Sequence, residues 1–302
     1  MRVVCLSGGV GGAKLARGLY DVLGSDLSVV VNVGDDVEVL GLAVSPDLDS
    51  VLYALAGLND EERGWGRVGE TWRALDSARA WGGDAWFQLG DLDLGLHLTR
   101  TAALARGEPL SAATRALAAA AGVTATLLPA TDNRLRTHVV TPNGTFPFQE
   151  WFVARRHEDE VDELLFDGAD AAAPASGVLE AIAAADALVL APSNPYVSLR
   201  PILAVGAIRD AIAARGVRCV AVSPLIGGRS VKGPLDRMLT RMAGGTTPAH
   251  VTHCYKGLID ALVIDHADAP AEADVPLFAT ATLMEDRAAS RRLAETVLEV
   301  AA

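Results

Sequence analysis

The chain has 302 residues, of which 50% are hydrophobic and 21% are charged. This composition predicts a folded protein with a sizeable core, because disordered chains combine low hydrophobicity with high charge. The 26 lysines and arginines against 38 aspartates and glutamates leave a net charge of −12, which excludes binding to nucleic acid or anionic membranes through bulk electrostatics. Phosphate binding would need backbone donors, a few placed basic residues or a metal ion.

The pattern of apolar residues and cysteines excludes further classes. No stretch approaches the roughly 18–20 continuous apolar residues of a membrane span, and residues 1–7 are too short for a signal peptide before the glycines begin. Cys5, Cys219 and Cys254 are scattered without a paired spacing, so neither a disulfide framework nor a zinc site is predicted. We therefore expect a protein of the reduced cytoplasm with no membrane partner.

The first elements along the chain are predicted to be a strand, a loop, a helix and a second strand. A β-branched run at 2–6 is followed by glycines at 8–12, helical spacing over 13–23 and a continuous apolar run at 27–33. A strand without alternation is typical of a parallel sheet that is buried on both faces.

The middle of the chain has a different pattern. Residues 47–58, 70–81, 93–106 and 111–121 have helical periodicity, with no strand between them. Further on, Asn143-Gly144 is the strongest short signal for a β-hairpin. The segment Phe148-Gln149-Glu150-Trp151 is interpreted as a strand, whose aromatic side chains either face the core or pack on a flat heterocycle. We expect a largely helical insertion with a small β-hairpin element, at about residues 46–175.

The second half returns to alternating elements. Helices are predicted at 178–185, 201–214 and 287–301, and strands at 187–191, 217–222, 261–264 and 276–280. Such alternation predicts an α/β fold with a Rossmann-like, doubly wound, mostly parallel sheet. No linker separates independent domains, so we expect a single domain, residues 1–302, with its nucleotide-binding core at about 1–45 and 176–302.

A glycine cluster lies between the first strand and the first helix. Glycines at this place let backbone N–H groups approach a phosphate, and the N-terminus of the helix adds a favourable dipole. The spacing matches neither a Walker A loop nor the dinucleotide G-x-G-x-x-G motif, and a tight turn without a ligand is the alternative. The position favours a nucleotide-phosphate site formed by Gly8, Gly9, Val10, Gly11, Gly12 and Lys14.

Aspartates follow the second strand and begin two of the predicted helices. Asn32-Val33-Gly34-Asp35-Asp36 ends the second strand, where the ligand crevice of this architecture forms. Asp47 and Asp49 begin the helix at 47–58, and Asp91 precedes the helix that carries His97. An aspartate in such a position is either a helix cap or a hard oxygen ligand for Mg²⁺, and position alone leaves both open.

Two polar loops follow buried strands of the second half. Ala191-Pro192-Ser193-Asn194-Pro195 follows the strand at 187–191, and Ser223–Gly228, with Lys232 beyond it, follows the next strand. Loops at the carboxyl ends of parallel strands carry binding residues in this architecture. We predict that Ser193, Asn194 and Pro195, together with Asn32, complete the nucleotide site.

Taken in order, these motifs resemble one family over almost the whole chain, from Gly8 to about Asp265. The motifs are GGVGGAK, NVGDD, SPDLDSVLY, DEERGWG, ETW, LGDLDLGLH, LLPATDN, FQEW, APSNP, SPLIGG and KGP. Together they resemble the 2-phospho-L-lactate transferase family, whose members are called CofD in archaea and FbiA in actinobacteria.

The resemblance implies an enzyme in the assembly of the deazaflavin coenzyme F420. Such enzymes move the phospho-three-carbon-acid group of a guanosine-diphosphate-activated donor to the ribityl hydroxyl of 7,8-didemethyl-8-hydroxy-5-deazariboflavin (Fo), and GMP is released. The group is 2-phospholactyl or phosphoenolpyruvyl, and the sequence does not distinguish lactate, enolpyruvate and glycerate donors. The resemblance also implies a Mg²⁺-dependent homodimer whose insertion, 46–175, forms the acceptor side.

The resemblance further implies roles for individual residues. Asp49 matches a position of the deazaflavin and metal site, and Asp47 and Asp36 lie beside it, so that Mg²⁺ on Asp49 and Asp47 and a general base at Asp36 or Asp49 are expected. Gln88 matches a position that contacts the deazaflavin, and Asp91 lies in the same motif. Relatives commonly read GDRDxATH there, whereas Leu92 and Leu96 replace the arginine and the threonine in this chain.

Two other functions remain open at this level. YvcK-like proteins of the same superfamily bind nucleotide sugars and act as regulators, but the RGWG and FQEW segments favour the transferase branch. A nicotinamide-dependent oxidoreductase is disfavoured by the glycine spacing and by the lack of a clear ribose-binding acid after the second strand.

Overall fold

The computed structural model describes all 302 residues and is built around a seven-stranded, all-parallel sheet. Across the sheet, the chain runs outward in both directions from its first strand, and the order is that of a Rossmann fold with one further strand. Its strands are, in spatial order, β5 (Thr126–Pro129), β2 (Leu27–Val31), β1 (Val3–Ser7), β9 (Ala187–Leu190), β10 (Arg218–Val222), β13 (Ala261–Asp265) and β14 (Leu277–Thr280). The predicted doubly wound sheet is therefore confirmed, and its topological switch point lies between β1 and β9.

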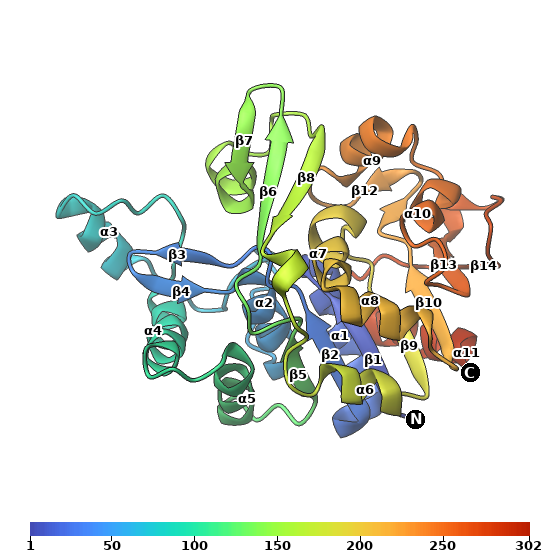
Figure 1. The fold of residues 1–302 in the computed structure, drawn as a ribbon, viewed down its shortest axis with the longest axis horizontal. Helices are drawn as coiled ribbons and strands as arrows, with labels where there is room; N and C mark the ends of the chain where they lie inside the picture. Colours follow the sequence, from blue (N-terminus) through green and yellow to red (C-terminus); the bar gives the residue numbers. More distant parts are fainter.

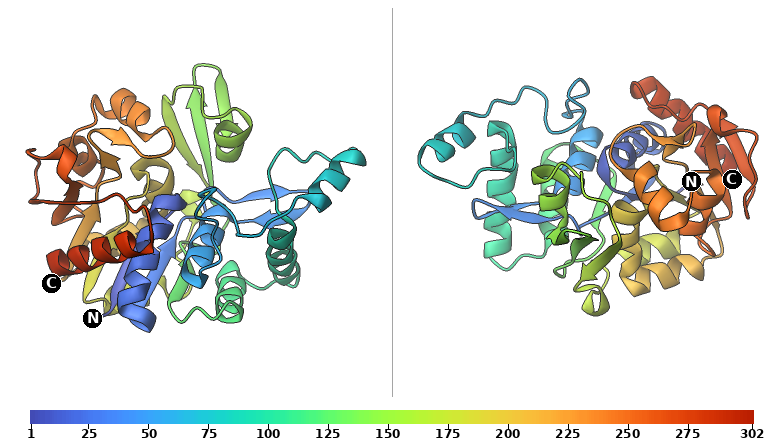
Figure 2. Two further views of the ribbon diagram at one scale, coloured as in Figure 1. Left: turned by 180° about the vertical axis from the view of Figure 1, so that it is seen from behind. Right: turned by 90° about the horizontal axis from the view of Figure 1, so that it is seen from above.

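Helices cover both faces of this sheet (Figures 1 and 2). On one face, α1 (Gly9–Leu23) packs between α2 (Pro46–Ala56) and α11 (Arg287–Ala301). The approach of α1 to α11 requires Gly18, because a Cβ there would clash with the backbone oxygen of Ser290. The opposite face carries α6 (Val178–Ala184), α7 (Arg200–Ala204) and α8 (Gly206–Ala213). Between β10 and β13, the chain forms α9 (Leu235–Ala243), α10 (Pro248–Cys254) and the two-residue strands β11 (Leu225–Ile226) and β12 (Arg229–Ser230).

One continuous core joins the sheet to these helices. The strands β1, β9 and β13 are apolar and buried along nearly their whole length, as expected for a sheet covered on both faces. The same core extends into the insertion, where Trp151 is fully buried. None of the helices combines the length and the apolarity that crossing a membrane requires.

The middle of the chain forms two projections from the sheet (Figure 1). One is an antiparallel ribbon of β3 (Val37–Val39) and β4 (Leu42–Val44), which extends toward the helices α3 (Arg73–Ala80) and α4 (Asp91–Ala105). The other is a three-stranded antiparallel sheet in which β6 (Arg136–Thr141) lies between β7 (Gly144–Pro147) and β8 (Glu163–Asp167). The predicted hairpin is confirmed, since Thr141 pairs with Gly144.

The main sheet also reaches into the predicted insertion. β5 lies within residues 46–175, yet it pairs in parallel with β2 at the edge of the main sheet. It follows α5 (Leu110–Ala120), which packs against it. The sequence did not reveal this strand, because four residues between an alanine-rich helix and a polar loop carry no readable periodicity. The insertion therefore consists of two segments, one on each side of β5.

Three predicted elements differ in the structure. Helix α1 begins at Gly9 rather than Ala13, because glycines, despite their poor helix propensity, allow this end of the helix to pack closely. The helix predicted at 201–214 is divided into α7 and α8 at Val205, whose backbone is extended before Gly206. Residues 148–154, which include the segment predicted as a strand, are helical and contain a π-helical turn over Glu150–Ala154.

Candidate active site

The switch point of the sheet joins the glycine cluster to the loop after β9. The hydroxyl of Ser193 donates to the carbonyl oxygen of Gly8 over 2.7 Å and accepts the backbone N–H of the same residue over 3.1 Å. A Cβ on Gly11 would lie 2.8 Å from the carbonyl oxygen of Pro192, and one on Gly12 would clash with Ser193 Oγ. These glycines are therefore needed for close packing between the start of α1 and this loop.

The same helix end also presents free backbone donors. The N–H groups of Val10 and Gly11 donate to no atom of the chain, and both residues are partly exposed. Unpaired N–H groups in the first turn of a helix bind anions, with support from the helix dipole. This geometry suits the predicted phosphate site. The ammonium of Lys14, in contrast, donates to the carbonyl oxygen of Met284 over 2.6 Å and is directed to the C-terminal segment.

Asn32 and Asn194, both predicted to bind the nucleotide, hold loops in place. The Asn32 amide donates to Asp47 Oδ2 over 2.9 Å, and its Oδ1 accepts the N–H of Gly34 over 2.7 Å. Asn194 Oδ1 accepts the N–H of Tyr196 over 2.9 Å and caps the π-helical turn Pro195–Leu199. The two asparagines fix the walls of the crevice, and direct contact with a nucleotide stays a prediction.

Asp47 lies in the first turn of α2 and points to the first turn of α1. Its Oδ1 accepts the backbone N–H of Gly9 over 2.8 Å, while Oδ2 accepts the amide of Asn32. Burial raises the pKa of Asp47 to about 6, although both hydrogen bonds favour the charged form. Asp47 therefore caps α1, whereas capping of its own helix was the alternative left open by the sequence.

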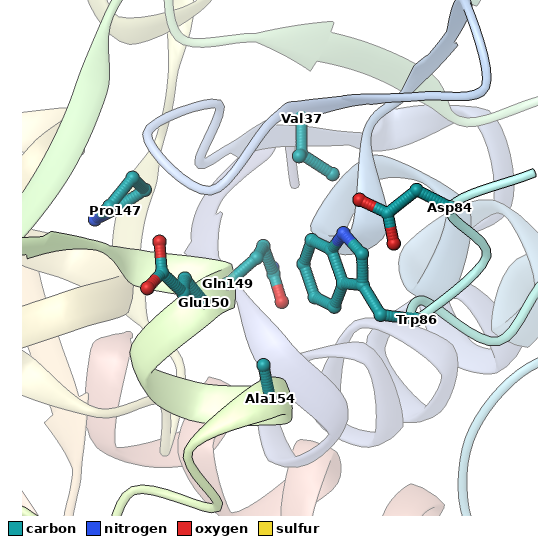
Figure 3. A pocket seen from close by; sticks show the side chains of 7 residues that line it. All are labelled: Val37, Asp84, Trp86, Pro147, Gln149, Glu150 and Ala154. Carbon is teal, nitrogen blue, oxygen red and sulfur yellow. The ribbon is translucent and has the colours of Figure 1, made fainter.

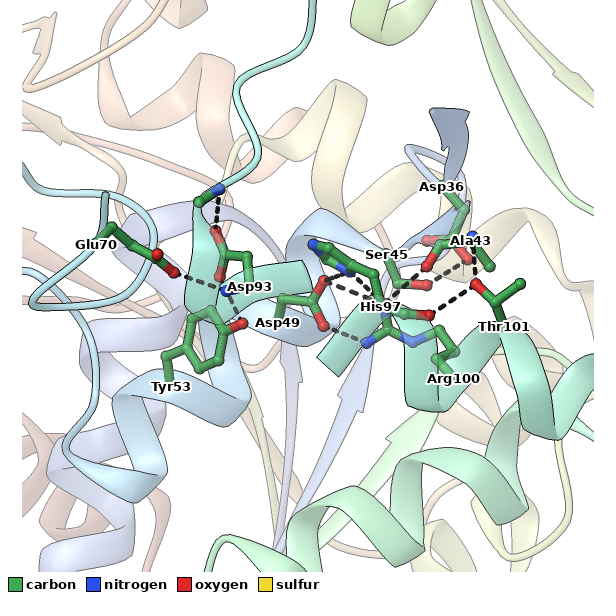
Figure 4. Close-up of polar contacts among 11 residues, drawn as sticks. Asp36, Ala43, Ser45, Asp49, Tyr53, Glu70, Asp93, His97, Arg100 and Thr101 are labelled. Atoms are coloured by element: carbon green, nitrogen blue, oxygen red, sulfur yellow. Dashed lines mark hydrogen bonds and ion pairs between the residues drawn. The ribbon is translucent and has the colours of Figure 1, made fainter. Parts of the chain in front are cut away.

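Asp49 forms a buried ion pair with Arg100 of α4 (Figure 4). Arg100 Nη1 donates to Asp49 Oδ2 over 3.1 Å, and Nη2 donates to Oδ1. The imidazole of His97 completes the group, with Nδ1 at 3.7 Å from Asp49 Oδ2. Burial lowers the pKa of His97, so this imidazole is neutral at physiological pH. The carboxylate predicted as the centre of the site is thus bound by Arg100 and lies beside His97, both from α4.

Asp35 and Asp36 add two further carboxylates at the end of β2. Asp36 Oδ2 accepts the hydroxyl of Ser45 over 3.0 Å, but its Oδ1, like that of Asp35, is shielded from solvent and has no partner. Burial raises the pKa of Asp36 to about 7. Burial and then the charge of Asp47 raise the pKa of Asp35 well above its usual range. We call Asp35, Asp36, Asp47 and Asp49 the carboxylate cluster.

The donor chemistry of the carboxylate cluster fits a magnesium ion. Mg²⁺ prefers hard oxygen ligands and is usually bound by one or two carboxylates together with water and substrate phosphates. The unpartnered Oδ1 atoms of Asp35 and Asp36 and the raised pKa values mark a place where positive charge is lacking. No three aspartate, glutamate, histidine or cysteine side chains converge as a complete ligand set. An ion bound here would therefore take most of its ligands from water and substrate phosphates.

Asp91, predicted to contact the deazaflavin, lies at the start of α4 and binds the start of α3. Its carboxylate accepts the N–H groups of Arg73 and Ala74 over 3.2 and 3.0 Å, as well as the hydroxyl of Thr71. These bonds lower the pKa of Asp91. Asp91 therefore joins the start of α4 to the start of α3, which corresponds to the capping alternative, although it caps the neighbouring helix instead of its own.

A second group of polar side chains holds α4 against α2 (Figure 4). Glu70 accepts the N–H groups of Leu92 and Asp93 over 2.8 and 2.7 Å. Asp93 in turn accepts the hydroxyl of Tyr53 over 2.6 Å. Burial, followed by the charges of Asp49 and Asp93, raises the pKa of Tyr53 above its usual range. These contacts fix α4 and so the position of Arg100.

A cavity of about 360 Å³ opens between the two projections (Figure 3). The indole of Trp86 and the carboxylate of Asp84 face Gln149 and Glu150 across it. The Gln149 amide donates to the backbone carbonyl of Asp35 over 3.3 Å, which connects the cavity to the carboxylate cluster. Its lining residues are Val37, Asp84, Trp86, Pro147, Gln149, Glu150 and Ala154.

The cavity changes which residues are expected on the acceptor side. Gln88 is exposed and is not among the lining residues, so its contact with a deazaflavin stays a prediction. Gln149 and Glu150 line the cavity, whereas the aromatic side chains on either side of them are buried and face the core, which was the first of the two alternatives for this segment. Trp86 was missed, because a tryptophan in a loop carries no signal of its own in a single sequence.

Arg100 and Asp35 are the other members of the site that sequence reasoning missed. Arg100 lies on the buried face of α4, three residues after His97, and an arginine at such a position signals a buried acidic partner. Asp35 precedes Asp36 in the same motif, and nothing in the sequence shows which of the two carboxylates points inward.

Comparison with known proteins shows the family to which the chain belongs. A family model described as 2-phospho-L-lactate transferase CofD matches residues 3–287. A "Phosphoenolpyruvate transferase" of Streptomyces griseus is 43% identical over 313 residues, covering 100% of this chain and 98% of that protein. One of Thermobifida fusca is 43% identical over 284 residues, covering 89% and 88%.

A solved structure adds information on the fold alone. A UPF0052-family protein from Bacillus halodurans superimposes with a TM-score of 0.65 at 19% identity, covering 98% of this chain and 99% of its own. The family match, in contrast, spans nearly the entire sequence and includes each motif on which the resemblance rests. The chain belongs to the CofD family of 2-phospho-L-lactate transferases.

Proposed function

We propose that this transferase moves a phosphoenolpyruvyl group from a guanosine-diphosphate-activated donor to the ribityl hydroxyl of Fo, with release of GMP and formation of dehydro coenzyme F420-0. The observation that carries the proposal is the position of the carboxylate cluster. Asp47 contacts the first turn of α1, and the backbone of Asp35 contacts Gln149 of the cavity. The cluster therefore connects a site for phosphate with a site for a flat acceptor.

The donor is proposed to bind at the switch point. The free N–H groups of Val10 and Gly11 face the crevice between the loops after β1 and β9, where a diphosphate would be neutralised by backbone dipoles. The relatives named above carry the name of a phosphoenolpyruvate transferase, which favours enolpyruvate over lactate or glycerate as the three-carbon acid.

The acceptor is proposed to bind in the cavity. The indole of Trp86 offers an aromatic face against which a planar deazaflavin can stack, and the Gln149 amide and the Asp84 and Glu150 carboxylates supply polar contacts at its rim. The ribityl chain would then extend toward Asp36.

The chain's own residues can manage the proton of the reaction. The ribityl oxygen forms a bond to the phosphorus that carries the enolpyruvyl group, the bond from that phosphorus to the GMP oxygen breaks, and the hydroxyl proton moves to Asp36. Asp36 suits a general base, because Oδ1 is unpartnered and burial raises its pKa to about 7. Asp49 is the weaker candidate, since Arg100 occupies both of its oxygens.

Mg²⁺ is part of the proposal. Asp49 and Asp47 stay its predicted ligands, and the unpartnered Oδ1 atom of Asp35 adds a candidate. When bound, the ion would supply positive charge to the diphosphate and to the leaving phosphate.

No covalent enzyme intermediate is proposed. Burial raises the pKa of Cys5 and of Cys219 to about 12, which leaves both thiols protonated and unreactive. Positioning and charge neutralisation are sufficient for phosphoryl transfer. A phosphorylated protein trapped with labelled donor would contradict this part of the proposal.

The proposed function is tested by incubating the protein with Fo, Mg²⁺ and each of the three guanosine donors in turn. Mass spectrometry should detect GMP together with the phosphoenolpyruvyl ester of Fo, formed fastest from the enolpyruvyl donor. Absence of product with all three donors, together with tight binding of a nucleotide sugar, would identify a YvcK-like regulator instead. Light scattering of the same sample tests the proposed homodimer.

A further inference from the structure

Arg100 is one of the most deeply buried charged side chains in the molecule, with a side-chain exposure of 2%. Besides its two bonds to Asp49, its guanidinium reaches the carbonyl oxygen of Ala43 over 3.4 Å and His97 Nδ1 over 3.5 Å. Its Nε has no partner. Arg100 is therefore fixed mainly by Asp49, and a buried arginine with an unsatisfied N–H is retained at a free-energy cost.

The contacts around Arg100 show which structural role this buried charge has. α4 is anchored to β4 next to Arg100, because the hydroxyl of Thr101 accepts the N–H of Ala43 over 2.8 Å and donates to the carbonyl oxygen of His97 over 2.7 Å. Arg100 thus projects from a fixed helix. Its two donors set both the position and the rotation of the Asp49 carboxylate, as a bidentate pair does.

Arg100 also supplies positive charge within the carboxylate cluster. It attracts Asp36 as well as Asp49, whereas Asp35 and Asp47 have no arginine in direct contact. A guanidinium on both oxygens of Asp49 opposes any other cation that would use this carboxylate, because like charges a few ångströms apart repel strongly in a partly desolvated site.

We propose that Arg100 is a positioning residue of the active site, which holds Asp49 in its working orientation and competes with a divalent cation for that carboxylate. The second half of this inference rests on the Mg²⁺ site of the proposed function, while the first half does not. The competition keeps the cluster neutralised before substrates arrive and makes tight Mg²⁺ binding depend on the phosphates of the donor.

The experiment compares three variants of the full chain. Arg100→Gln removes the charge, and Arg100→Lys keeps the charge but not the two-pronged contact. Arg106→Gln is the matched control, since it removes one charge from the end of the same helix, where Arg106 is exposed and paired with Glu108. Binding of Mg²⁺ alone is measured by calorimetry and by the rise in the thermal unfolding midpoint, and transfer is measured as kcat and KM.

We expect Arg100→Gln to bind Mg²⁺ about tenfold more tightly than the unchanged protein, because one competing charge is lost. Arg100→Lys should keep the Mg²⁺ affinity within about twofold, while kcat falls at least about tenfold and KM for the donor stays the same. Arg106→Gln should change neither quantity. Loss of the buried ion pair lowers the unfolding midpoint of Arg100→Gln under either role, but a purely structural role would leave its Mg²⁺ affinity unchanged.

Each outcome decides part of the inference. Unchanged or weaker Mg²⁺ binding by Arg100→Gln overturns the competition. If that variant does not fold, Arg100→Lys decides, and an unchanged kcat overturns the positioning role. If the unchanged protein binds no Mg²⁺ but Arg100→Lys loses kcat, the metal part of the proposed function and the competition both fail, whereas the positioning role is supported.

Discussion

The backbone N–H of Gly9 donates to Oδ1 of Asp47 over 2.8 Å, across 38 residues of sequence. This bond brings a carboxylate to the end of α1, where an anion is proposed to bind through Val10 and Gly11. The backbone N–H groups proposed to bind phosphate and the nearest carboxylate therefore lie at the same place, the N-terminus of α1. A phosphate at this place would be repelled by Asp47 unless a cation lay between them.

Asp47→Asn tests whether Asp47 repels the phosphate and whether a cation relieves this repulsion. The substitution removes the negative charge and can keep the hydrogen bond to Gly9 through the amide oxygen. We expect GDP to bind more tightly in the absence of Mg²⁺, and Mg²⁺ to improve that binding less than in the unchanged protein. Calorimetric titration with GDP, with and without Mg²⁺, measures both quantities. Weaker GDP binding in the absence of Mg²⁺ would show that Asp47 does not oppose the phosphate.

Asp49→Asn is expected to reduce product formation at least about 100-fold and also to destabilise the protein. The structure shows that this change leaves Arg100 buried without its charged partner. Breaking a buried ion pair from one side lowers the free energy of unfolding by about 3–5 kcal/mol. Mass spectrometry of the product and urea unfolding measure the two effects.

Asp91→Asn is the control for Asp49→Asn. Asp91 is partly exposed and caps the start of α3, so its substitution should lower the free energy of unfolding by about 1 kcal/mol and leave the transfer rate within a few-fold. An active Asp49→Asn enzyme, or an inactive but well-folded Asp91→Asn enzyme, would reverse the assignment of these two residues.

The raised pKa of Asp36, at about 7, predicts opposite pH dependences for stability and activity. The native state holds this proton more tightly than the unfolded chain, whose aspartates titrate near about 3.9. The contribution of Asp36 to the free energy of unfolding is therefore greatest below that value and is lost as the pH rises through about 7. A general base must be deprotonated, so kcat should rise through the same upper range.

Asp36→Asn tests the predicted pH dependences of both stability and activity. Its free energy of unfolding should depend less on pH between about 4 and 7 than that of the unchanged protein. Asp47, whose pKa is raised to about 6, contributes a smaller effect of the same sign in both proteins. Urea unfolding at several pH values measures the difference, and single-turnover rates measure the loss of the base. Parallel stability curves for the two proteins would contradict the assignment.

Gly12→Ala is expected to destabilise the switch point. A Cβ at this position clashes with Ser193 Oγ and approaches Ser7 Oγ to 2.5 Å, and such overpacking typically costs about 1–3 kcal/mol. Gly95→Ala is the control, because the same addition in α4 meets nothing within 4 Å and should raise the free energy of unfolding by up to about 1 kcal/mol. Equal effects of the two substitutions on urea unfolding would mean that α1 does not pack as described.

Trp86→Ala is expected to weaken Fo binding about tenfold, because the cavity loses its aromatic face. Trp81→Ala is the matched control, since that indole is 88% exposed and does not line the cavity. Titration with Fo, followed by the fluorescence of the deazaflavin, measures both affinities. If Trp81→Ala weakened binding as much as Trp86→Ala, the acceptor site would lie outside this cavity.

Much of the fold could be predicted from local patterns. Continuous apolar runs predicted β1, β2, β9, β10 and β13, because a strand covered on both faces needs no alternation. The Asn-Gly pair predicted the hairpin of β6 and β7, since its backbone conformations are favoured locally. β5 and the helical segment at 148–154 could not be predicted, because pairing at a sheet edge and packing around Trp151 decide them.

Local patterns in the sequence were sufficient for the class of fold, the family and the motifs that border the active site, because glycines and aspartates at strand ends and helix starts are local signals with few structural explanations. The contacts of each of these side chains follow from the three-dimensional structure. It placed Asp47 on α1, Asp91 on α3, Lys14 on Met284 and Arg100 on Asp49. The physical reason is that a charged group is satisfied by the partner that burial brings within reach, and such partners lie tens to hundreds of residues away in the chain.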